Sequence, residues 1–209
     1  MILDLTHPLG PNTPVYPGDP SPSISRLNNV ASDGFTDHSF TLGTHVGTHI
    51  DAPAHMITDG KTLGQYPPSR FVGRGIIVDV TTEFTLSALK SADVQPGDIV
   101  VLQTGLSQHF HHPDYFTNSP TIPEDIAKHL VAQRVSMVGV DMGTVDRPPF
   151  PIHKILLGGD VLIIENLTNL AQLPEVCTIV ALPLNLALDG SPCRVIASTE
   201  PIPALHQTP

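Results

Sequence analysis

The chain has 209 residues, of which 40% are hydrophobic and 14% are charged, and its formal net charge at pH 7 is −10. This length is sufficient for one domain with a substantial core, and we expect a single domain over residues 1–209. The acidic balance argues against nucleic-acid binding, which depends on basic surfaces. The two cysteines are too few for a disulfide framework. No apolar run reaches the ~18 residues of a membrane span, and the N-terminus carries no signal-like block, so we expect a cytoplasmic protein without membrane contact.

Short strands dominate the predicted secondary structure, because 22 prolines and 16 glycines favour turns over long helices. Compact runs of β-branched and apolar residues that are bounded by turn residues indicate buried strands. In chain order, the expected strands are Ile2–Leu5, Thr36–Leu42, Gly75–Val80, Asp98–Gln103, Val135–Val140, Val161–Glu165, Val176–Leu182 and Arg194–Ala197.

Three helices are expected between these strands. The first covers Leu86–Ala92, with Thr85 as its N-cap. The second follows Thr121–Glu124, which has the pattern of a capping box, and its apolar residues have helical spacing. The third is a short helix over His153–Leu157, ended by two glycines. Strands outnumber helices and only some alternate with them, which favours a mixed α/β sheet over a doubly wound fold.

The densest group of polar ligand-type side chains lies in the stretch His45-Val46-Gly47-Thr48-His49-Ile50-Asp51-Ala52-Pro53-Ala54-His55. Three imidazoles and a carboxylate so close together are costly to bury unless a divalent metal compensates them. In an extended segment these four side chains would share one face, whereas Pro53 would break a helix. A single histidine is usually an ordinary surface or core residue, but this combination indicates a strand–loop metal site.

The same stretch resembles the His-x-Gly-Thr-His-x-Asp-x-Pro-x-His motif of the cyclase family of metal-dependent hydrolases, which includes bacterial kynurenine formamidases (arylformamidases) and isatin hydrolases. Further blocks in the same order extend the resemblance along most of the chain. They are Asp4–Thr6, Pro14–Asp19, Gly139–Asp141, His153–Leu157, Ile163–Leu170, Ala181–Leu184 and Asp189–Arg194. The resemblance implies a single α/β domain with a mixed-sheet, swivelling-domain-like β/β/α fold around a barrel-like sheet.

The resemblance also implies a set of metal ligands. His45 and His49 would bind one metal, Asp51 would bridge to a second, and His153 and Glu165 would complete the second centre. Glu165 is supported by its position at the end of an apolar strand, where an ionised carboxylate is expensive without a compensating cation. Ligands of these types suit Zn and Mn about equally, and we expect two ions per subunit.

Other residues receive roles outside the ligand set. His55 is expected to be the general acid and base, because an imidazole can exchange protons near neutral pH. Tyr16 occupies the position of a substrate-contacting aromatic residue that is usually Trp in kynurenine formamidases. Asp141 is expected either to orient a ligand histidine or to act as a structural cap. The cluster His109–His112 is expected in a loop near the mouth of the pocket.

The activity implied by the resemblance is hydrolysis of N-formylkynurenine to kynurenine and formate by attack of a metal-activated hydroxide, a step of tryptophan breakdown. Tyr16 and the segment Asp141–Asp146 depart from the usual formamidase pattern, so an isatin hydrolase-like or other small cyclic-amide hydrolase stays open. A non-catalytic metal-binding protein is a third hypothesis, although the additional His55 argues for an open site. A serine hydrolase is disfavoured because the chain has no Gly-x-Ser-x-Gly elbow. The resemblance also implies a homodimer or tetramer acting on a small amide.

Overall fold

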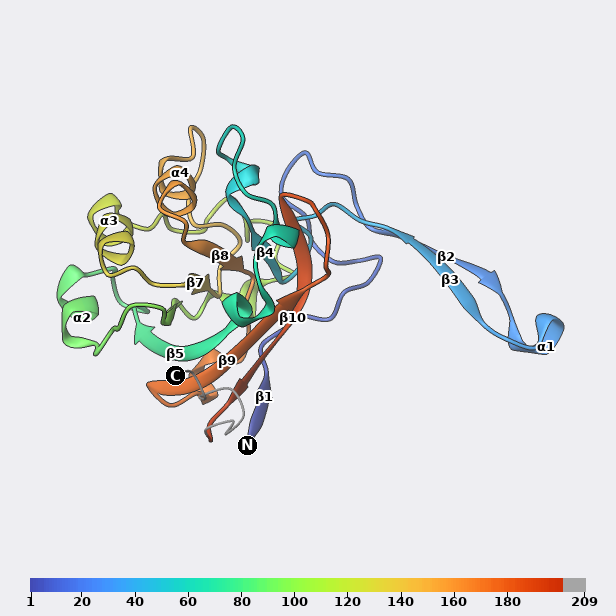
Figure 1. Ribbon diagram of the computed structural model, residues 1–209. Helices are drawn as coiled ribbons and strands as arrows, with labels where there is room; N and C mark the ends of the chain where they lie inside the picture. Colours follow the sequence, from blue (N-terminus) through green and yellow to red (C-terminus); the bar gives the residue numbers. More distant parts are fainter. Residues whose placement is uncertain (201–209) are drawn as a thin grey trace.

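The computed structural model describes residues 1–200 of the chain, and its centre is a mixed sheet closed into a barrel (Figure 1). Its strands are β1 (Ile2–Asp4), β4 (His49–Asp51), β5 (Val72–Asp79), β6 (Ile99–Gln103), β7 (Met137–Val140), β8 (Leu162–Glu165), β9 (Val176–Pro183) and β10 (Gly190–Ser198). The order is β1-β10-β4-β8-β7-β6-β5-β9, and pairing of β9 with β10 closes the ring. The strands β5 to β8 run parallel, and their other neighbours run antiparallel. The predicted mixed α/β sheet is confirmed.

Three helices cover the outer face of the parallel strands (Figure 1): α2 (Leu86–Ser91), α3 (Glu124–Ala132) and α4 (Pro151–Gly158). The strands beneath them are buried on both faces, as expected for parallel strands with helices on one side. Along β6, Val100 and Leu102 join the apolar cluster under the helices. Ile99 and Val101 alternate with them and join a second cluster inside the barrel.

The predicted helices are present, with one correction at a helix start. Thr85 caps α2 as expected, because its hydroxyl accepts a hydrogen bond from the backbone of Ala88 at 3.3 Å. The expected capping box before α3 is wrong, since the N-cap residue is Pro123 and makes no side-chain bond. The preceding Ile122 is fully buried and its backbone N–H donates to Val145, which holds Thr121 in an extended segment outside the helix. Each expected strand contains or overlaps an observed one.

A two-stranded ribbon projects from the body of the molecule (Figure 1). It consists of β2 (Ser23–Asn28) and β3 (Asp37–Thr41), joined through the short helix α1 (Val30–Asp33). The expected strand over Thr36–Leu42 corresponds to β3, whereas β2 was not predicted, because its sequence lacks the apolar run that burial demands. The 3-10 helices are η1 (Pro53–His55), η2 (Leu63–Gln65), η3 (Pro68–Phe71), η4 (Leu106–His109) and η5 (Leu170–Gln172). Within residues 1–200, no helix has the length and apolarity to cross a membrane.

Candidate active site

The pairing of β4 with β8 brings three of the predicted metal ligands to one face of the sheet. His49 lies directly opposite Glu165 in the antiparallel register, and Asp51 is two residues further along β4. Because side chains alternate along a strand, Ile50 points into the barrel while its two neighbours point towards the helices. All three polar side chains are buried. The strand register therefore builds half of the site.

The chain bends on both sides of β4, so only His49–Asp51 of this segment forms a regular strand. Gly47 adopts a positive φ of 65° before the strand, and the 3-10 helix η1 follows it from Pro53. Glycine adopts this backbone conformation without a steric cost. The two bends bring the rings of His45 and His55 to a centroid distance of 3.9 Å. The strand–loop interpretation of this segment is correct. The bends at Gly47 and Pro53, rather than the alternation of side chains along one strand, bring His45 and His55 together.

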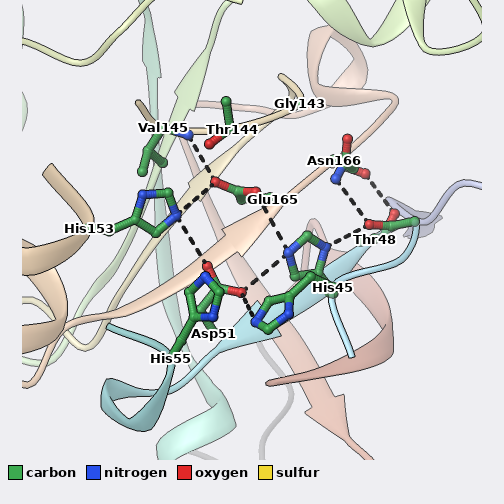
Figure 2. A network of polar contacts seen from close by, with 12 residues as sticks. His45, Thr48, Asp51, His55, Gly143, Thr144, Val145, His153, Glu165 and Asn166 are labelled. Carbon is green, nitrogen blue, oxygen red and sulfur yellow. Dashed lines mark hydrogen bonds and ion pairs between the residues drawn. The ribbon is translucent and has the colours of Figure 1, made fainter. Parts of the chain in front are cut away.

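The helix α4 contributes His153 from a distant part of the chain. Its imidazole is buried, and its Nε2 lies 3.4 Å from Oε1 of Glu165 and 3.7 Å from Oδ2 of Asp51. On the other side of the ring, Nδ1 lies 2.5 Å from Oδ1 of Asp146. The structure therefore places His153 beside both carboxylates that the sequence analysis assigned to the metal site (Figure 2).

The two carboxylates lie between pairs of histidines (Figure 2). Oδ1 of Asp51 is 3.4 Å from Nε2 of His45 and 3.2 Å from Nε2 of His49, whereas its Oδ2 faces His153. Glu165 similarly directs Oε2 to His49 at 3.6 Å and Oε1 to His153. Each carboxylate thus has one oxygen towards each side of the site, which is the disposition that a bridging ligand requires.

Each predicted histidine ligand is anchored through Nδ1 and presents Nε2 to the carboxylates. Nδ1 of His49 contacts the carbonyl of Gly47 at 2.8 Å, and Nδ1 of His45 contacts the hydroxyl of Thr44 at 3.0 Å. The carbonyl of Gly47 is itself held by the amide of Asn166 at 3.0 Å. Metal-binding histidines are commonly oriented in this way through their other ring nitrogen.

Unpartnered buried atoms and the donor set both fit a divalent metal. Among the residues that the structure describes, both oxygens of Asp51 and Nε2 of His45 are buried without a hydrogen-bond partner. Leaving such groups unsatisfied costs free energy, and imidazole nitrogens with carboxylate oxygens are ligands that Zn and Mn accept. Potential ligand atoms of His49, Asp51 and Glu165 lie within 4.8 Å of one another.

The electrostatics of the site favour positive charge. Burial alone would lower the pKa of His49 and of His153, but the neighbouring carboxylates outweigh it and raise these pKa values to about 9 and about 10. Although burial acts in the opposite direction, the His49 and His45 imidazoles hold the pKa of Asp51 well below its usual value. Burial lowers the pKa of His45 to about 4. A site that stabilises imidazolium so strongly also favours a metal cation.

His55 lies among the potential ligands rather than apart from them. Its ring is 3.9 Å from that of His45 and 5.7 Å from that of His153, measured between centroids. Its Nδ1 faces Oδ2 of Asp189 at 3.6 Å, and the same oxygen is 3.7 Å from Nε2 of His45. The sequence analysis did not single out Asp189, although it opens the block Asp189–Arg194 that carries part of the resemblance.

Two aspartates of one segment have different surroundings. Asp141 accepts hydrogen bonds from the backbone of Thr104 at 2.6 Å and of Gly105 at 2.9 Å, which is the structural cap of its two expected roles. Asp146 makes the contact with a ligand histidine instead. The sequence does not indicate which of the two contacts a histidine, because both residues are aspartates that follow β7 in a loop of irregular backbone.

An aromatic cavity of about 460 Å³ opens onto the carboxylates and histidines. Tyr16 lines it, as expected for a substrate contact, and its ring meets that of Phe116 edge-on at a centroid distance of 5.9 Å. Phe150 and Met56 complete the apolar part of the lining. The described residues that line this cavity do not include His109–His112, which were expected near its mouth. Phe116 was not anticipated from the sequence.

Comparisons with known proteins show the family of this chain. Residues 3–147 match the family model described as "Putative cyclase". The kynurenine formamidase of Geobacillus thermodenitrificans is 29% identical, with 92% of this chain and 94% of that protein covered. The isatin hydrolase of Roseibium aggregatum is 30% identical, with 94% and 90% covered. The solved structure of a predicted metal-dependent hydrolase from Bacillus stearothermophilus is 31% identical, with 96% and 98% covered and a TM-score of 0.81. The chain therefore belongs to the cyclase family of metal-dependent hydrolases.

Proposed function

We propose that this protein is an arylformamidase that cleaves the N-formyl amide of N-formylkynurenine, giving kynurenine and formate. The observation that carries the proposal is the convergence of three imidazoles and two bridging-type carboxylates on one buried site beneath an aromatic cavity. The kynurenine formamidase relative supports this substrate class. The reaction would place the protein in tryptophan breakdown.

Two metal ions fit the ligand arrangement. His45, His49 and Asp51 would hold one ion, while His153 and Glu165 would hold the other, with Asp51 shared between them. When bound, Zn or Mn ions make water acidic enough to attack at neutral pH and polarise the carbonyl group of the amide. Asp51 and Glu165, which are both buried, would offset part of the positive charge of the ions.

We assign the proton transfers of the reaction to His55. With Nδ1 turned towards Asp189, Nε2 is the nitrogen that exchanges protons. It would accept a proton from the attacking water and return it to the amine nitrogen as the C–N bond breaks, so that formate and the free amine leave. The side chain of His55 is 23% exposed, whereas those of His49 and His153 are 3% and 4% exposed. This exposure allows the proton to be exchanged with solvent between turnovers.

The cavity above the site suits an arylamine with a small acyl group. Tyr16, Phe116 and Phe150 present aromatic surfaces against which an aryl ring can pack edge-on or offset. The carboxylates and His55 line the same cavity, so an amide on a ring held by these aromatic residues would lie within the space that they share. Tyr16 in place of the usual Trp gives a smaller surface, which still provides a ring for packing.

Hydrolysis of N-formylkynurenine by the purified protein tests the proposal. We expect turnover that is abolished by chelation and restored by Zn or Mn. His55→Gln should reduce kcat about 10²- to 10⁴-fold, because general acid–base catalysis contributes about that factor. His38→Gln replaces an exposed histidine on the ribbon and is the matched control. Full turnover by the chelated protein, or by the His55 variant, would reject the proposed mechanism.

A cyclic amide is the second candidate substrate. The isatin hydrolase relative covers the chain as fully as the formamidase does, and Tyr16 departs from the residue usual in formamidases. Opening a cyclic amide needs the same attack and the same proton transfer to nitrogen, but both products stay in one molecule. The same assay with isatin distinguishes the two candidate substrates. Metal-dependent turnover of isatin without turnover of N-formylkynurenine would favour a cyclic-amide hydrolase.

A further inference from the structure

Asp146 is a buried carboxylate with contacts in two directions. It is 1% exposed and lies between β7 and α4. Its Oδ2 accepts hydrogen bonds from the backbone N–H groups of Ile152 at 2.5 Å and His153 at 3.3 Å, in the first turn of α4. Its Oδ1 lies 2.5 Å from Nδ1 of His153. One side chain therefore contacts the start of the helix and the imidazole that the helix carries.

The residue before Asp146 holds the other member of the same centre. The backbone N–H of Val145 donates to Oε1 of Glu165 at 2.8 Å, and that oxygen also faces Nε2 of His153 (Figure 2). The dipeptide Val145–Asp146 thus contacts both residues proposed to complete the second metal centre. It thus links β8 to α4, two elements that also pack directly against each other.

We propose that Asp146 is a positioning residue for the second metal centre, acting by keeping the proton of His153 on Nδ1 and its Nε2 free for the metal. A carboxylate has only acceptor oxygens, so it can pair with Nδ1 only when that nitrogen carries a hydrogen. In the neutral ring the lone pair is then on Nε2, the nitrogen that faces Asp51 and Glu165. The inference rests on the proposed role of His153 as a ligand.

Asparagine in place of Asp146 would move the hydrogen of the neutral His153 ring from Nδ1 to Nε2. The backbone N–H groups of α4 require an acceptor, so the amide oxygen would take the place of Oδ2. The NH₂ group would then face Nδ1 of His153 and donate to it. Nδ1 would have to accept this hydrogen bond, so the hydrogen of the neutral ring would lie on Nε2. Nε2 would then lack the lone pair with which it binds a metal. The helix cap is retained while the tautomer changes.

Asp141 provides a matched control for this substitution. It belongs to the same connection after β7 and is equally buried, at 1% exposed. Its carboxylate accepts hydrogen bonds from Thr104 and Gly105 and from no histidine among the described residues. Asp141→Asn therefore introduces the same chemical change at a comparable site without affecting a proposed ligand.

Calorimetric titration of the metal-free protein with Zn²⁺, in the absence of substrate, tests the proposal. His153→Ala defines the binding that remains when the second centre is lost. We expect Asp146→Asn to resemble His153→Ala, with affinity at that centre reduced about 10- to 100-fold, as for comparable outer contacts of metal ligands, while Asp141→Asn resembles the wild type. Wild-type binding by Asp146→Asn would overturn the proposal. Failure of His153→Ala to change the wild-type isotherm would instead reject His153 as a ligand, and the proposed metal centre with it.

A role for Asp146 only in stabilising α4 would give a different experimental result. Loss of the helix cap would lower the unfolding temperature and weaken both centres together, whereas the proposed role weakens one centre with little change in unfolding temperature. Nitrogen NMR of the histidine rings in the Zn²⁺-loaded wild type is a test that does not depend on the folding of any variant. A hydrogen on Nδ1 of His153 supports the proposal, and a hydrogen on Nε2 overturns it.

Discussion

Individual residues of the site are ionisable and buried, whereas protein cores usually contain apolar side chains. Asp51 is fully buried, yet neither of its oxygens has a hydrogen-bond partner in the described part of the chain. An ionised carboxylate in this position is unfavourable unless cations surround it. His49 and His153 provide positive charge in the absence of metal, as their raised pKa values indicate. Metal binding would replace these protons with a cation that the same atoms can coordinate.

Gly190 provides a test of the position of His45. Its backbone pairs with Asp51, and a Cβ built there would lie 2.7 Å from Nε2 of His45. Gly190→Ala should therefore displace this imidazole and lower Zn²⁺ affinity by at least about tenfold, because a misplaced ligand loses coordination geometry. Gly10→Ala is the control, since its Cβ would meet nothing within 4 Å. Unchanged Zn²⁺ affinity in a calorimetric titration of Gly190→Ala would show that His45 is not a ligand in this position.

His7 predicts a pH dependence of stability outside the metal site. Its ring stacks on Phe110 at a centroid distance of 3.8 Å, and burial lowers its pKa to about 4 from the ordinary 6.5. The folded protein therefore favours the neutral ring, and the unfolded chain takes up a proton first as the pH falls. This contribution to stability is complete above about pH 6.5 and is lost as the pH falls towards about 4.

The measurement is urea unfolding of the wild type and His7→Phe at about pH 7.5 and about pH 5. The wild type should lose more unfolding free energy between the two pH values than the variant, because phenylalanine keeps the stacking and takes up no proton. His38→Gln, at an exposed position, should behave as the wild type. An equal loss in the wild type and His7→Phe would mean that His7 is charged in the folded protein.

At the scale of elements, the sequence predicted most of the strands but not how they pair. Burial of β6 to β8 on both faces gives continuous apolar runs, which sequence analysis detects. The register that sets His49 opposite Glu165 joins residues more than a hundred positions apart, and neither alternation nor spacing encodes it. Only the family resemblance linked these residues. The start of α3 was mispredicted because a tertiary contact of Ile122 overrides the local capping pattern.

The ribbon of β2 and β3 leads us to propose that the protein is a homo-oligomer. A two-stranded ribbon alone is marginally stable in water, yet this one leaves Leu27 58% exposed, Val30 64% and Phe35 55%. At its base, Phe40 shares a groove with the exposed Leu184 of the body. A second copy could cover both the tip of the ribbon and the groove, since an isologous interface uses the same surfaces twice.

Light scattering coupled to size-exclusion chromatography checks this proposal. The wild type should elute with at least twice the mass of one chain, and the double variant Val30→Glu with Phe35→Glu should shift towards one chain, because buried charge disfavours the interface. Val176→Glu places one such charge on a residue of β9 that is 48% exposed and should leave the mass unchanged. A wild-type mass of one chain would exclude the oligomer.

In the whole molecule, the apolar clusters that stabilise the fold are separate from the polar site. One apolar cluster fills the barrel, a second packs the helices against it, and the polar site lies where β4, β8 and α4 meet. The mixed α/β class followed from the sequence, because strands outnumbered helices. Closure of the sheet through β9 and β10 did not, since closure depends on pairings between distant segments rather than on local pattern.

We propose that hydrolysis takes place at a metal centre built from Asp51 and Glu165 with the surrounding histidines. The most direct test is stepwise reconstitution of metal-free protein with Zn²⁺ or Mn²⁺, with the rate of N-formylkynurenine hydrolysis measured against ions bound per chain. We predict no turnover without metal and a rate that rises until two ions are bound. Full turnover by the metal-free protein, or filling of the site without any turnover of this amide or of isatin, would contradict the account.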